Sequence, residues 1–193
     1  AVPGGAAEAN PALSKQVNLD ATLALFEEAA AAGQRPRIVF ASTIAVLGAP
    51  LPDTVDDQCA IVPQMIYGTH KAMVELALAD MTRRGLLDAV TVRLPGIVAR
   101  PPAPSGLKSA FMSNLFHNLK AGEHFVSPVS AAATLWLMSV PQCVDNLIHA
   151  GQLDTALMPT SRVVTLPALR CTMGELANAV AGQLAVSTDL VSY

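Results

Sequence analysis

The chain has 193 residues, of which 52% are hydrophobic and 14% are charged, and its formal net charge at pH 7 is −3. This length and apolar content allow a substantial buried core, formed by one domain or by a domain and part of another. The low charge provides no basic surface for nucleic acid. No apolar run reaches the roughly 18 to 20 residues of a membrane span, so we expect neither nucleic acid nor membrane as a partner.

The first 33 residues predict a loop followed by a helix. Pro3 and Asn10–Pro11 are typical of loops, and Gly4–Gly5 follows no hydrophobic strand, so it is not the glycine-rich turn of a dinucleotide-binding fold. Apolar residues then recur at steps of three and four, which predicts an amphipathic helix; they are Leu19, Leu23, Phe26 and Ala30. Gly33 is expected to end this helix.

Two hydroxyl residues end the next predicted element. Residues 37–41 are typical of a short buried strand, and Ser42 and Thr43 follow at its carboxyl end. The segment from Gly48 to Pro63 contains three prolines, which favour an irregular connection. A strand-to-helix crossover therefore leads from the hydroxyl pair to the segment that begins at Tyr67.

Tyr67 and Lys71 are spaced for proton transfer if this segment is helical, because residues i and i+4 share one helix face. A tyrosine with a pKa of about 10 is a poor base at neutral pH, but a nearby ammonium favours the phenolate. Ser42 or Thr43 can orient the substrate oxygen by a hydrogen bond. No side chain accepts a hydride, so the chemistry implies a nicotinamide cofactor, NAD or NADP. The same spacing also occurs on ordinary solvated helices.

The stretch Phe40–Gly48, followed by Tyr67 and Lys71, resembles the extended short-chain dehydrogenase/reductase family, or NAD-dependent epimerase/dehydratase family, which contains the nucleotide-sugar epimerases. The resemblance implies an α/β fold, with a Rossmann-like doubly wound parallel sheet and a smaller substrate-binding part. It also implies a Ser/Thr–Tyr–Lys mechanism. Alignment on Gly48 places the catalytic hydroxyl on Thr43 and its cofactor-side neighbour on Ser42, and a shift of one residue exchanges these roles.

The resemblance further implies the cofactor contacts, which are Ser42, Tyr67, Lys71, Asn18, Leu94 and Pro95. Asn18 lies in a segment similar to the family's helix start near the cofactor, although a plain polar residue in a first helical turn explains it too. Residues 90–94 predict the next buried strand, with a turn at its carboxyl end, where ligands bind in open α/β sheets. Arg93 is either a solvated strand end or a residue with a direct role.

The predicted domain division places residues 1–102 in the C-terminal portion of a dinucleotide-binding Rossmann-like domain. Residues 103–193 would form mostly the substrate-binding part, incomplete at its C-terminus. The first strand, the glycine-rich turn and the acidic residue for the ribose are not in this sequence, so we expect it to begin partway into the domain.

Gly96 bears on the substrate, because nucleotide-sugar enzymes of the family usually carry an asparagine there. The surrounding sequence is more similar to the branch that oxidises small sugar acids, which implies NAD(P)-dependent oxidation of a secondary hydroxyl. A nucleotide-sugar epimerase or dehydratase with tightly bound NAD and a non-catalytic NAD(P)-sensing protein of the same fold are the alternatives. The family often dimerises through the helices that contain Asn18 and Tyr67, so a homodimer is expected.

The last ninety residues predict helices over 107–119 and 144–150 and a strand over 162–166, and the Thr172–Glu175 pattern predicts a capping box. The cysteines are odd in number and far apart, which argues against a disulfide framework and for a reducing, cytoplasmic location; they are Cys59, Cys143 and Cys171. Neither these nor the four histidines form a zinc pattern, so no metal site is expected.

Overall fold

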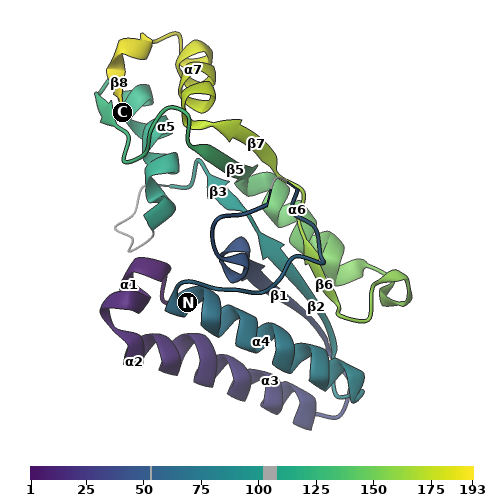
Figure 1. Ribbon diagram of the computed structural model, residues 1–193. Helices are drawn as coiled ribbons and strands as arrows, with labels where there is room; N and C mark the ends of the chain where they lie inside the picture. The colour runs from purple at the N-terminus through teal and green to yellow at the C-terminus, as the bar shows by residue number, and fades with distance from the viewer. Residues whose placement is uncertain (53, 102–107) are drawn as a thin grey trace. The chain divides into compact units, whose positions relative to one another are not determined.

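The computed structural model describes residues 1–52, 54–101 and 108–193 (Figure 1). The chain divides into two compact units. The first comprises Ala1–Leu94 and Val144–Leu166, and the second comprises Pro95–Cys143 and Pro167–Tyr193. The predicted domain boundary at residues 102 and 103 and the predicted helix start at Leu107 lie outside the described residues.

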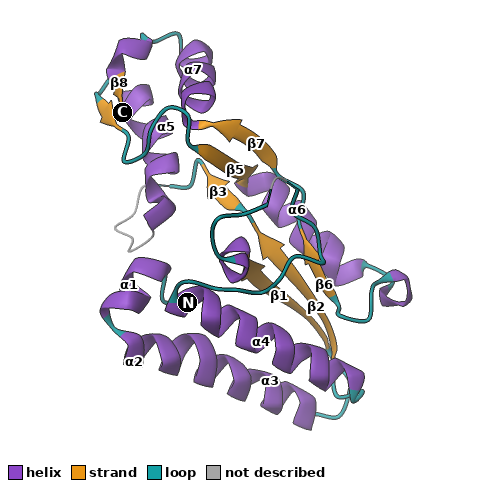
Figure 2. Cartoon of the chain, viewed as in Figure 1, coloured by secondary structure: helices purple, strands orange, loops and turns teal. Residues whose placement is uncertain are grey.

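The first unit contains three parallel strands, with helices before and between them (Figure 2). Its elements in chain order are α1 (Gly4–Ala9), α2 (Pro11–Ser14), the π-helix η1 (Lys15–Asp20), α3 (Ala21–Ala31), β1 (Arg37–Thr43), the 3-10 helix η2 (Ile44–Leu47), α4 (Ile66–Arg83), β2 (Asp88–Leu94), most of α6 (Val140–Gln152), η4 (Thr155–Leu157) and β6 (Val163–Thr165).

Helices lie against both faces of the β1–β2–β6 sheet, as successive residues of β1 show. Phe40 packs in one hydrophobic cluster with Val74 and Leu78 of α4. Val39 points to the opposite face, where its side chain lies near Gly151 of α6. The central strand β2 is buried along almost its whole length, as parallel strands covered on both faces usually are. The α/β fold with parallel strands is therefore confirmed.

Unit two has its own core, formed by apolar residues of α5, α7 and β5. Its elements are β3 (Gly96–Val98), η3 (Lys108–Ala110), α5 (Phe111–Ala121), β4 (Phe125–Val126), β5 (Thr134–Ser139), β7 (Leu169–Thr172), α7 (Met173–Leu184), η5 (Thr188–Leu190) and β8 (Val191–Ser192). β5 pairs parallel with β3 and antiparallel with β7. The predicted capping box at Thr172 and Glu175 is confirmed at the start of α7.

The N-terminal prediction was wrong in one respect, because residues expected as loop form two short helices. Pro3 precedes α1 as its N-cap, and Asn10 separates α1 from α2. The side chain of Asn10 accepts a hydrogen bond from the backbone N–H of Leu13, and Pro11 occupies the first helical position. Both features favour a helix start rather than a loop.

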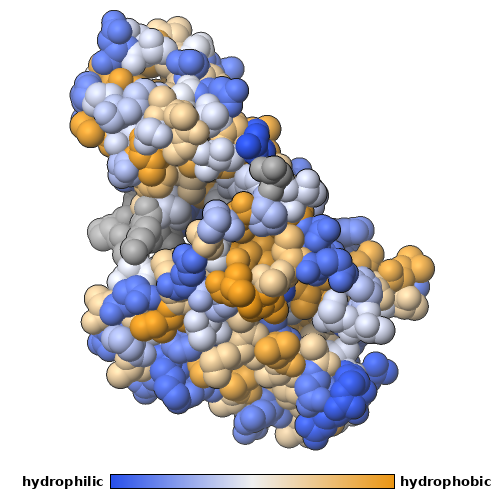
Figure 3. Space-filling view, in the orientation of Figure 1, coloured by the Kyte–Doolittle hydropathy of each residue, from blue (hydrophilic) through white to orange (hydrophobic). Residues whose placement is uncertain are grey.

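Apolar side chains gather on the exposed surface of α3 and α4 (Figure 3). Leu25 of α3 is 65% exposed and Leu76 of α4 is 64% exposed, and Met73 lies one turn before Leu76. Among the described residues, no helix has both the length and the apolar character required to cross a bilayer. The three cysteines are free thiols, as predicted.

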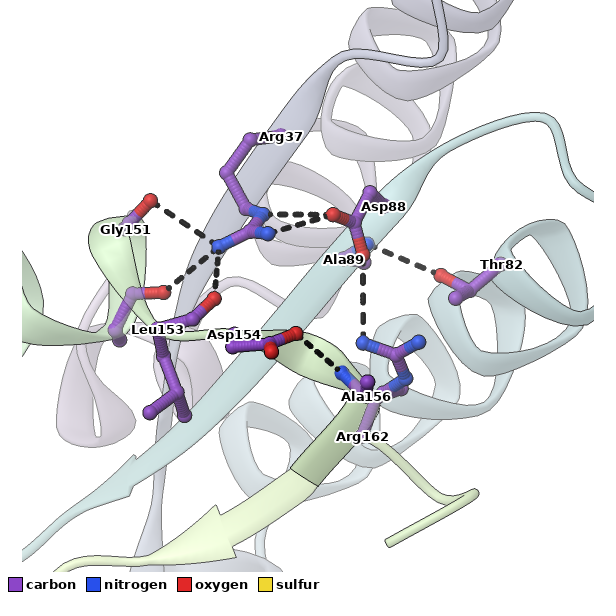
Figure 4. Close-up of polar contacts among 10 residues, drawn as sticks. Arg37, Thr82, Asp88, Ala89, Gly151, Leu153, Asp154, Ala156 and Arg162 are labelled. Atoms are coloured by element: carbon purple, nitrogen blue, oxygen red, sulfur yellow. Dashed lines mark hydrogen bonds and ion pairs between the residues drawn. The ribbon is translucent and has the colours of Figure 1, made fainter. Parts of the chain in front are cut away.

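A charged cluster joins the amino ends of the strands in the first unit (Figure 4). Arg37 at the start of β1 donates to Asp88 at the start of β2, with Nη2–Oδ2 2.7 Å and Nε–Oδ2 3.0 Å. Its Nη1 donates to carbonyl oxygens at the end of α6, 3.1 Å from Gly151 and 3.0 Å from Leu153. Arg37 thus binds carbonyls that a helix end leaves without intrahelical partners.

Candidate active site

The helix that carries Tyr67 begins where two other segments contact it. The N-cap residue Met65 makes no side-chain cap, and instead a carboxylate oxygen of Glu8 in α1 accepts the backbone N–H of Ile66 at 2.7 Å. A negative charge at this end also suits the helix dipole. Gly68 allows the first turn to approach η2, which directly follows Thr43. The expected helix is confirmed, and it begins beside the hydroxyl pair.

Lys71 lies between β1 and Tyr67. Its Nζ donates to the carbonyl oxygen of Ala41 at 2.8 Å, and it lies 4.4 Å from the ring centroid of Phe40. The same nitrogen is 5.8 Å from the ring centroid of Tyr67. The ammonium is therefore close to the phenol ring, as the four-residue spacing predicts.

Proton abstraction needs an ionised Tyr67 beside a charged Lys71, and burial shifts the pKa values of both groups against these charged forms. Burial raises the pKa of the Tyr67 phenol above its usual value. Burial also lowers the pKa of the Lys71 ammonium, and the nearby Glu75 carboxylate opposes this shift. The sequence alone predicts that Lys71 lowers the pKa of Tyr67, whereas desolvation of the half-buried phenol is the larger effect here.

The two hydroxyls are in different surroundings, because consecutive strand residues point to opposite faces. Ser42 is buried and donates a short hydrogen bond to Oε1 of Glu75 on α4. Thr43 is partly exposed, and its Oγ1 accepts the backbone N–H of Ala45 at 3.2 Å. A hydroxyl that accepts one bond can still donate its proton. Thr43 is therefore the better placed of the two to meet a substrate.

The remaining predicted cofactor residues fall in separate places. Leu94 is the register partner of Thr43 across β1 and β2, so both lie at the carboxyl edge of the sheet. Pro95 follows β2 as the first residue of the second unit.

Asn18 is buried in η1, and its amide pairs with the backbone of Val2, accepting from N at 2.7 Å and donating to O at 2.8 Å. Asn18 thus holds the first residues of the chain in place.

Three residues that shape this site are not singled out by their sequence pattern: Glu8, Gly68 and Glu75. Glu75 forms a buried ion pair with Arg93, with Nη2–Oε2 2.8 Å, so Arg93 is not the solvated strand end that was one of its two predicted interpretations. Gly68 and Glu8 position the start of α4. Glu75 could have been found from its place four residues after Lys71 on the buried helix face. Among the described residues, no group of three His, Cys, Asp or Glu is placed to hold a metal ion.

Residues 3–136 match the profile of the NAD dependent epimerase/dehydratase family. The chain belongs to this family. It is 39% identical over 180 residues to a D-erythronate dehydrogenase from Cupriavidus necator and 36% identical over 176 residues to one from Haemophilus influenzae. These matches cover 93% and 91% of the chain and 56% of each relative. The chain therefore spans a little over half the length of these curated relatives.

Solved structures of the family have the same fold. A nucleoside-diphosphate-sugar epimerase from Agrobacterium tumefaciens superposes with a TM-score of 0.92 at 36% identity, covering 100% of this chain and 58% of its own. An L-threonine 3-dehydrogenase from Trypanosoma brucei gives 0.89 at 25% identity, covering 100% and 59%. The Rossmann-like fold expected from the sequence is confirmed by these superpositions.

Proposed function

We propose that this chain is part of an NAD-dependent dehydrogenase that oxidises a secondary hydroxyl of a small sugar acid, of the D-erythronate type. The observation that carries the proposal is the convergence of Thr43, Tyr67 and Lys71 where the carboxyl end of β1 meets the start of α4. The names of the two relatives at 39% and 36% identity support the substrate class. Gly96, where nucleotide-sugar enzymes usually carry asparagine, agrees with it.

In the proposed reaction, Thr43 orients the substrate hydroxyl, and the Tyr67 phenolate takes the proton of that hydroxyl. The carbon that bears the hydroxyl gives up its hydrogen as a hydride, so that a ketone forms. NAD, when bound, supplies the hydride acceptor. Lys71 keeps a positive charge beside the phenol and so favours its ionised form. Because burial raises the pKa of Tyr67, we expect oxidation to be faster at mildly alkaline pH than at neutral pH.

The residues at the edge of the sheet fit the nicotinamide half of such a cofactor. An ammonium has three N–H donors, and Lys71 uses one of them on the carbonyl oxygen of Ala41. The other donors and the Tyr67 hydroxyl suit ribose hydroxyls. Asn18 suits a direct contact with the cofactor less well than Lys71 and Tyr67 do, since its amide is bonded to the backbone of Val2. We assign Asn18 an indirect role, which is to hold residues 1–3 in place.

Substitution of Tyr67 by Phe tests the proposal in the full-length protein. Removal of the general base should lower kcat about 10²- to 10⁴-fold. The dissociation constant of NAD should rise far less, by about 10-fold at most, because Tyr67 would supply only one of the ribose hydrogen bonds. The matched control is Tyr193→Phe, because Tyr193 is the other tyrosine of this sequence and lies in the second unit. Formation of NADH at 340 nm with a panel of aldonic acids measures turnover. Full turnover by Tyr67→Phe would rule out the mechanism.

A nucleotide-sugar epimerase is the second candidate, favoured by the superposition on the Agrobacterium tumefaciens structure. Such an enzyme returns the hydride to its substrate, so it produces no net NADH. Interconversion of nucleotide sugars, with no NADH from any aldonic acid, would favour this candidate over the dehydrogenase.

We further propose that the protein is a homodimer that uses the exposed surface of α3 and α4. Leu25, Met73 and Leu76 present apolar side chains there, and Val17 of η1 is also exposed. Exposed apolar groups clustered on adjacent helices are typical of protein interfaces. The surface belongs to the first unit, and the same helix α4 carries Tyr67 on its other side.

A further inference from the structure

A buried carboxylate lies between the helix and the strands of the candidate site. Glu75 of α4 is only 1% exposed, and its carboxylate accepts the Ser42 hydroxyl through Oε1. Arg93 donates to the same carboxylate, with Nη2–Oε2 2.8 Å and Nε 3.2 Å from each oxygen. A charge this deeply buried is tolerated only where such partners compensate for its lost hydration.

The carboxylate joins the elements that supply the proposed catalytic groups. Ser42 and Arg93 are register partners in β1 and β2, so Glu75 binds both strands at one level of the sheet. The next residues along these strands are Thr43 and Leu94, at the carboxyl edge. On α4, Glu75 follows Lys71 by one turn and Tyr67 by two. The spacing between Thr43 and the Tyr67–Lys71 face therefore depends on bonds made by Glu75.

Glu75 also supplies negative charge near Lys71. Its carboxylate opposes the lowering of the Lys71 pKa by burial. Arg93 of β2 is bonded to Glu75, and β1 contributes the Ala41 carbonyl and the Phe40 ring. The other ionisable groups near this site, on α4 or on elements packed against it, are Tyr67, His70, Glu8 and the exposed pair Lys15–Asp20. His70 contacts Ser14, and Glu8 accepts the backbone N–H of Ile66.

We propose that Glu75 is a positioning residue for the dehydrogenation, which fixes the strand of Thr43 against the helix of Tyr67 and Lys71 and supplies the counter-charge for the Lys71 ammonium. This inference rests on the proposed function, since the three groups act together only in that reaction. A merely structural role would require Glu75 only to neutralise Arg93.

Two variants of the full-length protein separate these roles. Glu75→Gln leaves Arg93 as a buried cation without its counter-charge and should lower the melting temperature by several degrees. The double variant Glu75→Gln/Arg93→Met removes both charges and should recover most of that loss, because a buried ion pair can be replaced by apolar volume. We expect kcat/KM to stay reduced by about 10²-fold in both variants, because the Thr43–Tyr67 geometry is loosened.

The titration of Lys71, followed by NMR of its ¹³C-labelled ε-carbon, provides a readout besides activity. In Glu75→Gln its midpoint should move to lower pH, and the alkaline limb of kcat/KM should move with it, since a less negative site holds the proton less firmly. In the double variant this shift should be smaller, because loss of the Arg93 cation offsets part of it. Wild-type kcat/KM in the double variant, together with an unmoved Lys71 midpoint in Glu75→Gln, would overturn the inference. If the unaltered protein oxidises no aldonic acid, the proposed function fails. An unmoved Lys71 midpoint in Glu75→Gln would independently reject the counter-charge role.

Discussion

Gly68 offers a sharp test of how closely the start of α4 must approach η2. It is the third residue of α4 and directly follows Tyr67. A Cβ atom placed on Gly68 would lie 2.5 Å from the carbonyl oxygen of Ala45, 3.1 Å from the carbonyl carbon and 3.2 Å from Cβ of Pro63. The nearest atoms belong to the backbone, which cannot rotate away. Substitution of Gly68 by Ala must therefore move the helix or η2.

The size of this movement follows from the contact distances. A carbon and a carbonyl oxygen in close contact are separated by about 3.3 Å, so the two segments must part by about 0.8 Å. Tyr67 would then move relative to Thr43 by a similar amount. Misplacement of about 1 Å can cost about 10²-fold in rate. Stability should change less, because overpacking costs about 1–3 kcal/mol and alanine in a helix recovers about 0.5–1 kcal/mol of it.

The matched control is Gly182→Ala in α7. Gly182 is exposed in a helix, and its added Cβ would meet no atom within 4 Å. The Gly182→Ala variant should leave kcat/KM unchanged and raise the melting temperature slightly. The assay is NADH formation together with thermal unfolding for both variants. If Gly68→Ala matched Gly182→Ala in rate and melting temperature, the approach of α4 to η2 would have no role in catalysis.

Two further predictions concern stability and assembly. Burial raises the pKa of Asp88, but hydrogen bonds and charge from Arg37 outweigh it and hold that pKa below its usual value. Asp88→Asn should therefore lower the free energy of unfolding by about 1–3 kcal/mol at pH 7. Urea unfolding should show a smaller difference near pH 3, because the stabilisation by Asp88 is complete above its unfolded pKa of about 3.9 and is lost as pH falls through its lower folded pKa. Equal differences at both pH values would contradict this. Leu76→Asp should shift sedimentation from dimer to monomer at micromolar concentration, whereas Leu157→Asp, at an 81% exposed leucine of η4, should not; an unchanged dimer with Leu76→Asp would exclude the proposed surface.

The fold was largely predictable, because its signals are local. The buried apolar run of β2, the strand that ends in Ser42 and Thr43, and the helix beginning near Tyr67 all follow from periodicity and breaker residues. The capping box of α7 depends on residues three positions apart. Helix α1 was missed because its sequence contains two glycines and no side-chain cap.

The sequence suggests residues for the candidate site but does not predict the contacts among them. The sequence places Ser42 and Thr43 together, yet cannot tell which of them points toward Glu75. A glutamate four residues after a lysine is also typical of a solvated helix pair. What distinguishes Glu75 is its bond to Arg93, 18 residues away, and the sequence pattern does not reveal that bond. Likewise Asn18 finds its partner 16 residues earlier, at Val2. Contacts between distant segments arise from tertiary packing, which no local pattern encodes.

Two charged clusters fix β1 and β2 at opposite ends. Arg37 and Asp88 join their amino ends, and Glu75 binds Ser42 and Arg93 beside their carboxyl ends. Arg37 and Thr43 are the first and last residues of β1, which separates them by about 20 Å. A change at the amino end should therefore lower stability without moving the catalytic groups, whereas a change at Glu75 should do both. Asp88→Asn thus provides a comparison for Glu75→Gln: a similar loss of stability with unchanged kcat/KM would attribute the slower turnover of Glu75→Gln to geometry and charge at the site.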